Sequence, residues 1–420
     1  MKHLLFLATR SAWNRKLTLG LTTIAIALSV TLLIGVDRLR NEAREGFNHS
    51  VSGTDLIIGA RTSPVQLMLY AVFRIGEATN NIRWNAYQDI VADPLVAWSI
   101  PLSLGDSHHG FPVLGTTSAY FDHFHYGDDQ ALKFSKGKPF IDTFDAVLGS
   151  EVAARLDYHL GDHITLSHGT GTVGLPEHAD KPFVITGILA PTGTPVDRTV
   201  HVSLEAISAI HLDWVGGAPM PGFTIPQKYV HKFDLKPKEI TAALVGLKSR
   251  AAVFRMQRMV NDFSEEPLLA VMPGVALEQL WQVLDVAEKS LLAVSAMVVV
   301  VGLSGLVAVI LAGLNERRRE LAILRAVGAR AHEILLLLTL EGLFVTIAGI
   351  VSGVVVLELL TLVLAPTAQA TYGIAIRPSF VTLDEMKLLG MVITVGLLAS
   401  LVPGYRAYRL SLSDGLTPRI

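Results

Sequence analysis

Histidine is the residue type in this sequence whose number and placement point most directly to chemistry. The chain has 14 histidines, and all but two lie between positions 49 and 231. His123 and His125 are separated by one residue, the spacing that places two imidazoles on one face of a strand. Imidazole and carboxylate ligands suit Zn²⁺, Cu²⁺ or Ni²⁺, so these residues are a candidate zinc site, although we favour the interpretation that they are solvated and unrelated surface histidines. The candidate ligands are His108, His109, His123 and His125, with Asp122 or Asp128 nearby.

The composition of the remaining residues excludes several classes of protein. The absence of cysteine excludes disulfides, thiolate metal sites, cysteine nucleophiles and lipid-modified cysteines. A formal net charge of -2 gives no electrostatic footprint for nucleic acid. With 50% hydrophobic and only 17% charged residues, the 420-residue chain is too apolar for an ordinary soluble protein, whose charged share is about 25%. We therefore expect a membrane protein.

Four long apolar runs predict the membrane-spanning helices. Each run is long enough, or nearly so, to cross about 30 Å of hydrocarbon at about 1.5 Å per residue. A cleaved signal peptide is the alternative for the first run, but that run is long, and charged residues follow it where small residues would precede a cleavage site. We thus predict an α-helical membrane protein with four transmembrane helices, one plus three. The predicted spans are residues 17–36, 291–314, 334–360 and 388–405.

Lysine and arginine near the span ends predict the orientation of the chain. Basic residues gather in segments 1–16, 315–333 and 406–420, which all fall on one side of the membrane if there are four spans. Because such residues favour the cytoplasmic side, we expect both termini in the cytoplasm and the protein in the inner membrane. Residues 37–289 and the short loop 361–387 are then extracytoplasmic.

The large segment 37–289 has the pattern of a folded mixed α+β domain. Residues 183–189 and 200–202 are rich in β-branched residues and predict strands, while 151–156 predict a short helix. Leucines at three- and four-residue spacing from Leu277 predict a stalk helix that leads into the second span. The apolar stretch 64–76 is interpreted as core, with contact to the bilayer surface as the alternative. We expect residues 169–180 to form a loop.

Two glutamates stand inside the third predicted span. An ionisable group in hydrocarbon costs several kcal/mol unless it faces protein or reaches an interface. We interpret Glu358, near the outer end, as reaching the interface, and Glu341 as making a structural hydrogen bond within the helix bundle, with a proton relay as the alternative. Gly349 and Gly353 between them offer a small-residue face for close helix contact.

A basic string directly after the second span carries the most specific signal in the chain. Residues 315–329 read NERRRELAILRAVGA. The arginines alone would serve to anchor the cytoplasmic end of a span, and the leucine and isoleucine positions predict one apolar side of a helix near the interface. The whole string closely resembles the segment after the second membrane helix of ABC transporter permeases of the FtsX/MacB/LolC type. That resemblance implies a coupling helix that docks on a cytoplasmic ATPase, carried here by Glu316, Arg317, Arg318, Arg319, Glu320, Arg325 and Gly328.

The resemblance extends through most of the chain, with one departure. The residues around Glu341 and the closing segment from Pro403 to Leu416 are similar to the family pattern, and Val147–Ala153 with Gly161-Asp162 resembles a MacB-like periplasmic core domain. MacB itself carries its ATPase on the same chain, but the P-loop pattern Gly-x-x-x-x-Gly-Lys-[Ser/Thr] does not occur in these residues. The resemblance therefore implies a separate ATPase subunit that binds ATP and Mg²⁺, and no cofactor on this chain apart from the predicted zinc.

The function implied by the resemblance is mechanical rather than enzymatic. A pair of permease chains, identical or paralogous, would couple ATP hydrolysis to motion of the periplasmic domain and so export or extract a lipid, lipoprotein, peptide or small molecule. A periplasmic substrate-carrying partner and membrane lipids are the other expected partners. Two alternatives stay open: a zinc-linked envelope transporter that uses the histidine-rich domain, and an FtsX-like signalling scaffold that regulates an extracytoplasmic enzyme.

Overall fold

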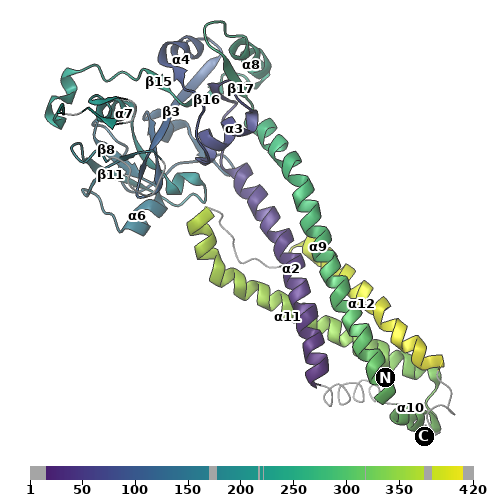
Figure 1. The fold of residues 1–420 in the computed structure, drawn as a ribbon. Coiled ribbons are helices and arrows are strands. Elements are labelled where there is room, and N and C mark those ends of the chain that lie inside the picture. Colours follow the sequence, from purple (N-terminus) through teal and green to yellow (C-terminus); the bar gives the residue numbers. More distant parts are fainter. Residues whose placement is uncertain are drawn as a thin grey trace. The chain divides into compact units, whose positions relative to one another are not determined.

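The chain folds into two compact units. The computed structural model describes residues 16–169, 177–215, 218–220, 222–316, 318–372 and 381–409. Residues 1–42 and 285–420 form one unit, called here the helical unit, and residues 43–284 form the other, the sheet domain (Figure 1). The predicted termini 1–15 and 410–420 and most of the predicted loop 169–180 lie outside the described residues.

Four helices in the described parts of the chain are long and apolar enough to cross a membrane. One lies near the N-terminus and three follow the sheet domain, which confirms the predicted one-plus-three arrangement. The predicted stalk and second span belong to one continuous helix, and the third helix continues beyond the predicted end at Leu360. The helices are α2 (Lys16–His49), α9 (Pro273–Glu316), α11 (Ala331–Tyr372) and α12 (Leu383–Arg409), with the short α10 (Arg318–Ala326) between α9 and α11.

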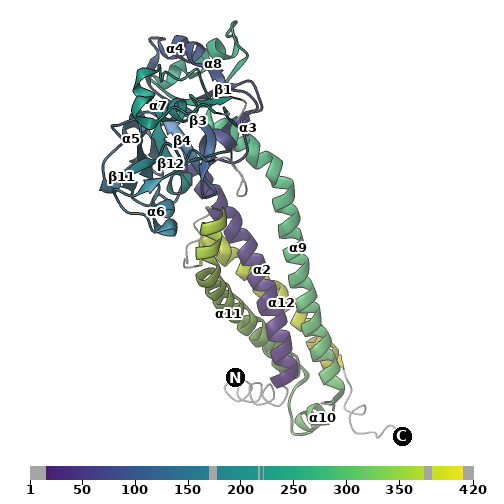
Figure 2. The same cartoon turned by 60° about the vertical axis from the view of Figure 1, so that its left-hand side comes forward.

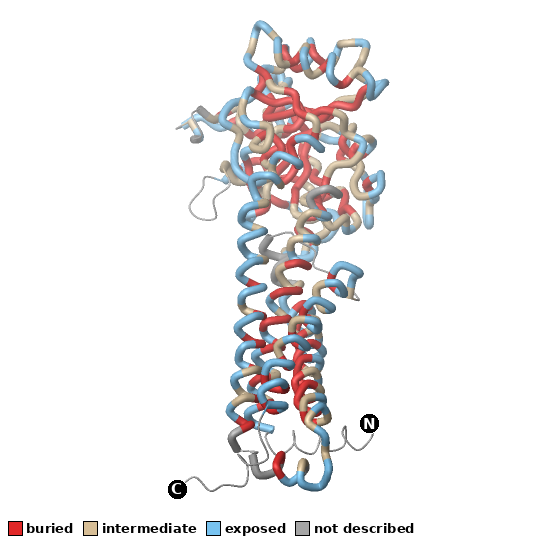
Figure 3. The backbone as a smooth tube through the Cα atoms, turned by 90° about the vertical axis from the view of Figure 1, so that its right-hand side faces the viewer, coloured by how far each residue is buried: buried red, intermediate tan, exposed pale blue. Residues whose placement is uncertain are grey.

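Small residues bring helices α2 and α11 into close contact. A Cβ atom at Gly353 would lie 2.6 Å from the backbone oxygen of Ala27, and one at Gly349 would lie 2.6 Å from the Ile26 side chain. The Thr31 hydroxyl also donates a hydrogen bond to the Gly353 carbonyl oxygen at 2.9 Å. The predicted small-residue face is therefore confirmed as a helix contact. Figure 3 shows buried and exposed stretches along the long helices. Exposed positions such as Leu21 and Leu28 on α2 and Val355 on α11 are apolar, as expected for side chains that face lipid.

In the part of the sheet domain that the structure describes, 11 strands form one mixed sheet. Most neighbouring strands are antiparallel, while β12 pairs parallel with β4 and β11 pairs parallel with β8. The predicted strands at 183–189 and 200–202 are confirmed. The main path is β17 (Leu268–Val271), β1 (Leu56–Ala60), β16 (Ala242–Leu247), β3 (Val96–His108), β4 (Phe111–Thr116), β12 (Val200–Ser203), β8 (Asp145–Leu148), β11 (Phe183–Leu189) and β7 (Phe134–Gly137). Beside it, β10 (Ser167–His168) pairs with β3, and β9 (His163–Ile164) pairs with β11.

Short helices and turns cover the sheet and complete three hydrophobic cores. The segment predicted as core at 64–76 forms α3 (Pro64–Met68) and the π-helix η1 (Leu69–Phe73), and Leu67 and Tyr70 there are buried, as expected. Figure 2 shows α4 (Trp84–Val91) and α8 (Val253–Asn261) near β1, and these three elements contribute residues to one of the cores. Further short α-helices of this domain are α5 (Ala119–His123), α6 (Ser150–Leu156) and α7 (Leu204–Ile210). Two-residue strand pairs are β2 with β15 (Ile82–Arg83, Glu239–Ile240), β5 with β6 (His125–Tyr126, Gln130–Ala131) and β13 with β14 (Trp214–Val215, Ala218–Pro219).

A bulge in the longest strand re-aims one acidic side chain. The register of β3 against β4 shifts between Leu104 and Ser107, and Gly105 within the shift has φ +142°. Asp106, beside it, is then paired directly with His168 of β10. Because a bulge bends a strand locally and changes where its side chains point, this irregularity sets the position of Asp106.

Candidate functional site

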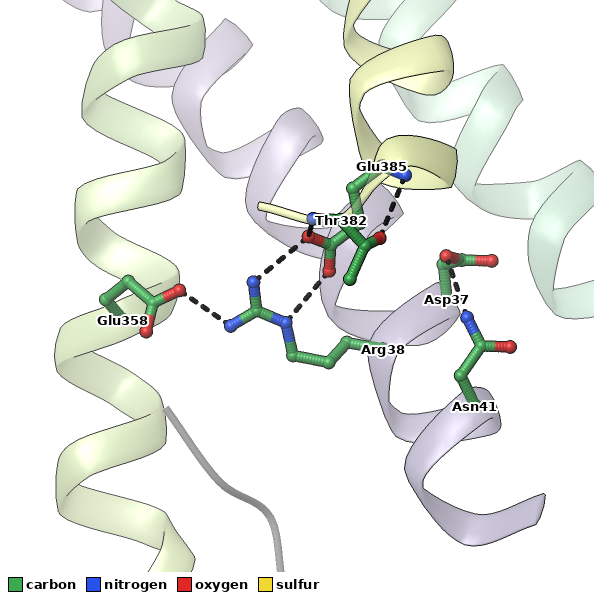
Figure 4. Close-up of polar contacts among 6 residues, drawn as sticks. All are labelled: Asp37, Arg38, Asn41, Glu358, Thr382 and Glu385. Atoms are coloured by element: carbon green, nitrogen blue, oxygen red, sulfur yellow. Dashed lines mark hydrogen bonds and ion pairs between the residues drawn. The ribbon is translucent and has the colours of Figure 1, made fainter. Parts of the chain in front are cut away.

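A buried arginine connects three helices of the helical unit. The Arg38 guanidinium on α2 donates from Nη1 to Glu358 Oε1 on α11 at 2.7 Å and from Nε to Glu385 Oε1 on α12 at 2.9 Å. A further hydrogen bond runs from Arg38 Nη2 to Glu385 Oε2 at 3.3 Å, so the contact with Glu385 is bidentate (Figure 4). We call Arg38, Glu358 and Glu385 the Arg38 node. It ties α2, α11 and α12 together by charge-assisted hydrogen bonds.

Glu385 is held in place by the start of its own helix. The Thr382 hydroxyl accepts a hydrogen bond from the Glu385 backbone N–H at 3.2 Å, and Glu385 Oε2 accepts one from the Thr382 N–H at 2.8 Å. These reciprocal bonds form a capping box, Thr-x-x-Glu, at the N-terminus of α12 (Figure 4). The same carboxylate therefore caps α12 and binds Arg38, so the local sequence fixes its orientation.

The environment of the node makes each charge depend on its partner. The side chains of Arg38 and Glu385 are 5% and 2% exposed, while Glu358 is 31% exposed. Removing one member of a buried ion pair leaves a charge without compensation and costs about 3–5 kcal/mol. The sequence interpretation of Glu358 as a group that reaches the interface stays a prediction, and the structure adds an ion pair with Arg38 that the sequence did not indicate. Glu341, the other predicted intramembrane group, is buried at 2% exposure.

The predicted coupling string forms a separate short helix between two spans. Helix α9 ends at Glu316, α10 covers Arg318–Ala326, and Gly328 has φ +108°, a backbone conformation that suits glycine and ends the segment. Leu321 on α10 is buried in the helical unit, whereas Ile323 and Val327 are 60% and 83% exposed. Arg317 lies outside the described residues. Arg318, Arg319, Glu320 and Arg325 all belong to α10.

The structure places the four predicted zinc ligands in different settings. Both ring nitrogens of His108 have partners, since Nδ1 lies 2.6 Å from the Thr165 carbonyl oxygen and Nε2 lies 3.0 Å from the Tyr158 hydroxyl. Burial lowers the pKa of His108 to about 4, which keeps this ring neutral. His109 occupies the turn after β3 with φ +48°. His108 is therefore a structural hydrogen-bonding group.

The strand geometry predicted for His123 and His125 is wrong. Helix α5 ends at His123, and β5 begins at His125, so the two residues do not alternate along one strand. The His123 ring stacks on Trp98 with ring centroids 5.3 Å apart, and His125 Nδ1 lies 2.9 Å from the His123 carbonyl oxygen. Within the described residues, these histidines do not form a group that could share a metal ion.

A different group of residues in the sheet domain has the geometry of a metal site. Ligand atoms of its members all lie within 4.8 Å of one another. Burial opposes ionisation of its carboxyl group, but hydrogen bonds from two of its histidines outweigh burial and hold the pKa of Asp106 at about 2. A metal-binding carboxylate is needed in this ionised form. The group, which we call the Asp106 cluster, consists of Asp106, His168, His178 and His211.

Comparison with known proteins places the two units in one family. Residues 19–244 match the MacB-like periplasmic core domain, and residues 292–412 match the FtsX-like permease C-terminal domain. The fold and these matches define a multi-pass membrane permease with a periplasmic-type domain. The chain belongs to the FtsX/MacB-type family of ABC transporter permeases.

Two solved structures are similar to part of the chain. The periplasmic region of MacB from Actinobacillus actinomycetemcomitans is 10% identical, with 55% of this chain and 94% of that chain covered and a TM-score of 0.33. The extracellular domain of the noncanonic ABC-type transporter YknZ from Gram-positive bacteria is 12% identical, with 52% and 99% covered and a TM-score of 0.30. No curated protein matches the chain.

Sequence reasoning missed Arg38, Glu385 and the Asp106 cluster. The spacing Thr382-x-x-Glu385 before an apolar run is itself a signal for a helix start, and it could have located one half of the Arg38 node. The members of the Asp106 cluster are separated by up to about a hundred residues along the chain, so no local spacing in the sequence marks them.

Proposed function

We propose that this chain is the membrane permease subunit of an ABC transporter and couples ATP hydrolysis on a separate subunit to motion of its sheet domain. The family assignment supports this role, since permeases of this type work with ABC ATPases. The P-loop pattern is absent from the 420 residues, so we place the ATP and Mg²⁺ site on a partner chain. The motion would export or extract a lipid, lipoprotein, peptide or small molecule from the envelope.

The observation that carries the proposal is the short helix α10. It lies between the membrane-spanning helices α9 and α11, and it carries the arginine-rich string that resembles the family's coupling helix. Exposed Ile323 and Val327 offer apolar contact area on a segment otherwise rich in charge. Exposed apolar side chains on a helix whose sequence is rich in arginine suit a protein partner, because apolar residues and arginine are both frequent in protein interfaces.

Movement of α10 would reach the other spans because the Arg38 node joins three of them. We propose that α2, α11 and α12 tilt together, since bidentate contact between Arg38 and Glu385 resists independent rotation of these helices. Glu316, Arg317, Arg318, Arg319, Glu320, Arg325 and Gly328 remain the proposed coupling residues. The working unit would contain a second permease chain, identical or paralogous, and a periplasmic partner would deliver or receive the substrate.

Purification of the native complex tests the assignment directly. The chain, tagged and expressed at its natural level, is extracted in a mild detergent, and the co-purifying proteins are identified by mass spectrometry. We expect an ATP-binding subunit with a P-loop in a fixed ratio to the permease, absent when an unrelated membrane protein carries the same tag. Recovery of the intact chain with an extracytoplasmic hydrolase and without a P-loop ATPase would instead support the signalling scaffold.

Topology is tested separately by labelling introduced cysteines, because the native chain has none. With both termini in the cytoplasm, Asp128→Cys should react with an impermeant thiol reagent applied from outside the inner membrane. Ala331→Cys, at the start of α11, should react only after the membrane is permeabilised. External labelling at position 331 would contradict the proposed orientation.

A further inference from the structure

The Asp106 cluster gathers three imidazoles and one carboxylate from separate elements of the sheet domain. Asp106 lies on β3 and His168 on β10, where the two are direct cross-strand partners. His211 follows the last residue of α7. His178 follows Glu177, which forms an isolated antiparallel β-bridge with Ser167 of β10. The backbone N–H of His178 donates a hydrogen bond to the Leu166 carbonyl oxygen. The paired strands β3 and β10, the segment at His178 and the end of α7 therefore each contribute side chains to the cluster.

Distances within the cluster match the spacing of ligands around a tetrahedral ion. His168 Nδ1 lies 3.2 Å from Asp106 Oδ1 and 3.1 Å from His211 Nε2, and His211 Nε2 lies 3.5 Å from Asp106 Oδ1. Ligand atoms at about 2.0–2.1 Å from a tetrahedral Zn²⁺ are about 3.3 Å apart. Three ligand atoms are thus already arranged as one face of such a tetrahedron.

Hydrogen bonding alone does not explain the burial of His178, the fourth member of the Asp106 cluster. His178 is fully buried, at 0% exposure, and among the described residues neither of its ring nitrogens has a hydrogen-bond partner. Buried polar atoms are almost always paired, because an unpaired one costs about 1–3 kcal/mol. His168 Nδ1 also lies within hydrogen-bonding distance of both Asp106 Oδ1 and His211 Nε2, so three potential metal-ligand atoms crowd together. A metal ion would satisfy both residues at once.

The surroundings prepare the histidines to act as ligands. His211 Nδ1 lies 2.8 Å from the Ile207 carbonyl oxygen, so in the Nδ1–H tautomer it donates there, and Nε2, which faces Asp106, becomes a metal ligand once it releases its own proton. A metal-binding histidine is commonly oriented in this way by a second hydrogen bond. The Trp214 ring packs over His178 with centroids 4.0 Å apart and limits its movement.

A neighbouring ion pair fixes the two chain segments that bear His178 and His211. Lys181 Nζ lies 2.9 Å from both carboxylate oxygens of Asp213 and 2.7 Å from Asp180 Oδ2, and the Lys181 side chain is fully buried. The two carboxylates offset the lysine charge, so this cation does not leave a net positive field beside the cluster. The scaffold is therefore compatible with a bound divalent cation.

We propose that Asp106, His168, His178 and His211 form a binding site for a divalent transition-metal ion, with Zn²⁺ the ion that fits best. Three imidazoles and a carboxylate match the ligand preferences of zinc, and four protein ligands complete a tetrahedron. The closed coordination sphere makes this a binding site rather than a hydrolytic one. The side chains of His168 and His211 are 38% and 27% exposed, which leaves the ion a route to solvent. The occupied site would fasten the end of α7 to β3.

Zinc titration of the full chain tests the site. The chain is purified in detergent with a tag that contains no histidine, stripped with a chelator, and titrated against a competing zinc indicator. We expect one Zn²⁺ per chain, and a loss of affinity of more than about 100-fold in His178→Gln and in His211→Gln, because even outer-shell partners of zinc ligands are worth about 10–100-fold. The matched control is the double variant His123→Ala/His125→Ala, which should bind as the wild type does.

Spectroscopy of the unmutated chain tests the site without relying on variants, which can lose zinc binding simply because they fail to fold. Co²⁺ bound in place of zinc should give the intense visible absorption of a tetrahedral centre, and X-ray absorption at the zinc edge should show nitrogen and oxygen ligands only. Absence of saturable binding, octahedral Co²⁺, or binding lost in the His123/His125 control but retained in His178→Gln would overturn the proposal. No step of this test measures ATP hydrolysis, so its outcome is independent of the proposed transport function.

Discussion

Buried charge is handled differently in the two units of this molecule. In the helical unit a single arginine compensates two carboxylates from two other helices. In the sheet domain Asp106 is surrounded by histidines, and one of these, His178, has no partner for either ring nitrogen among the described residues. A complete ion network holds elements together permanently, whereas an incomplete set of ligands makes that part of the fold responsive to an external ion. We infer that the helical unit is built for transmission and the sheet domain for binding.

The largest expected effect comes from breaking the Arg38 node. Arg38→Met should lower the stability of the helical unit by about 3–5 kcal/mol, because Glu385 and Glu358 lose their shared cation. Thermal unfolding in detergent measures this loss. The matched control is Arg40→Met, whose pair with Glu288 is more exposed at 29% and 14% and should be worth only about 0–1 kcal/mol.

A double variant of the Arg38 node distinguishes the effect of an uncompensated charge from the effect of lost side-chain packing. Arg38→Met combined with Glu385→Gln removes both buried charges and should recover much of the lost stability, since replacing both partners of a buried pair is often nearly neutral. If the double variant is no more stable than Arg38→Met alone, packing of the arginine side chain rather than its charge holds these helices.

The sheet domain should show a pH dependence to which His201 contributes. Burial, and then the positive charge of Arg74, lower the pKa of His201 to about 3 from its usual 6.5. The unfolded chain takes up a proton below pH 6.5 while the folded domain does not, so the stability of the folded state is complete above that pH and is lost as pH falls toward 3. From pH 7 to pH 5 the loss from this residue should be about 2 kcal/mol.

Thiol labelling measures this pH dependence inside the full chain. A cysteine substituted for the fully buried Ala146 reacts only when the domain opens, and the native chain has no other cysteine. His201→Phe should reduce the dependence of opening on pH by the contribution of this residue, while His108, whose pKa burial also lowers, keeps part of it. His163→Gln, at an exposed position, should leave it unchanged. Equal slopes for His201→Phe and the wild type would show that other groups dominate acid stability.

The smallest expected effect concerns the contact between α2 and α11. Gly353→Ala should lower the stability of the helical unit by about 1 kcal/mol, because the new methyl group meets the Ala27 backbone at 2.6 Å. Gly390→Ala, where a Cβ meets nothing within 4 Å, is the control and should be neutral or slightly stabilising. Unchanged stability in both variants would mean that α2 and α11 can move apart to accept the new methyl group without a loss of free energy of unfolding.

The sequence predicts the helical unit better than it predicts the sites. Apolar runs locate four spans because each run signals its own helix, and Phe183–Leu189 shows the same local clarity as a strand. The partner of Glu358 was not foreseen because Arg38 lies 320 positions away in sequence, and no local pattern joins the two. The histidines were grouped by sequence proximity, but the end of α5 at His123 and the bulge beside Asp106 decide which side chains meet.

The most direct test of the coupling role measures ATP hydrolysis by the complete complex. Permease and partner ATPase are reconstituted in lipid nanodiscs, and the wild type is compared with Arg318→Glu/Arg325→Glu. The control is Lys136→Glu/Lys138→Glu, which makes the same change in net charge at two exposed positions of the sheet domain. We predict that the α10 variant keeps its thermal stability but either fails to assemble with the ATPase or shows stimulated ATPase activity reduced by at least about tenfold. The control variant should keep both assembly and activity. Full assembly and full activity in the α10 variant would contradict the coupling role.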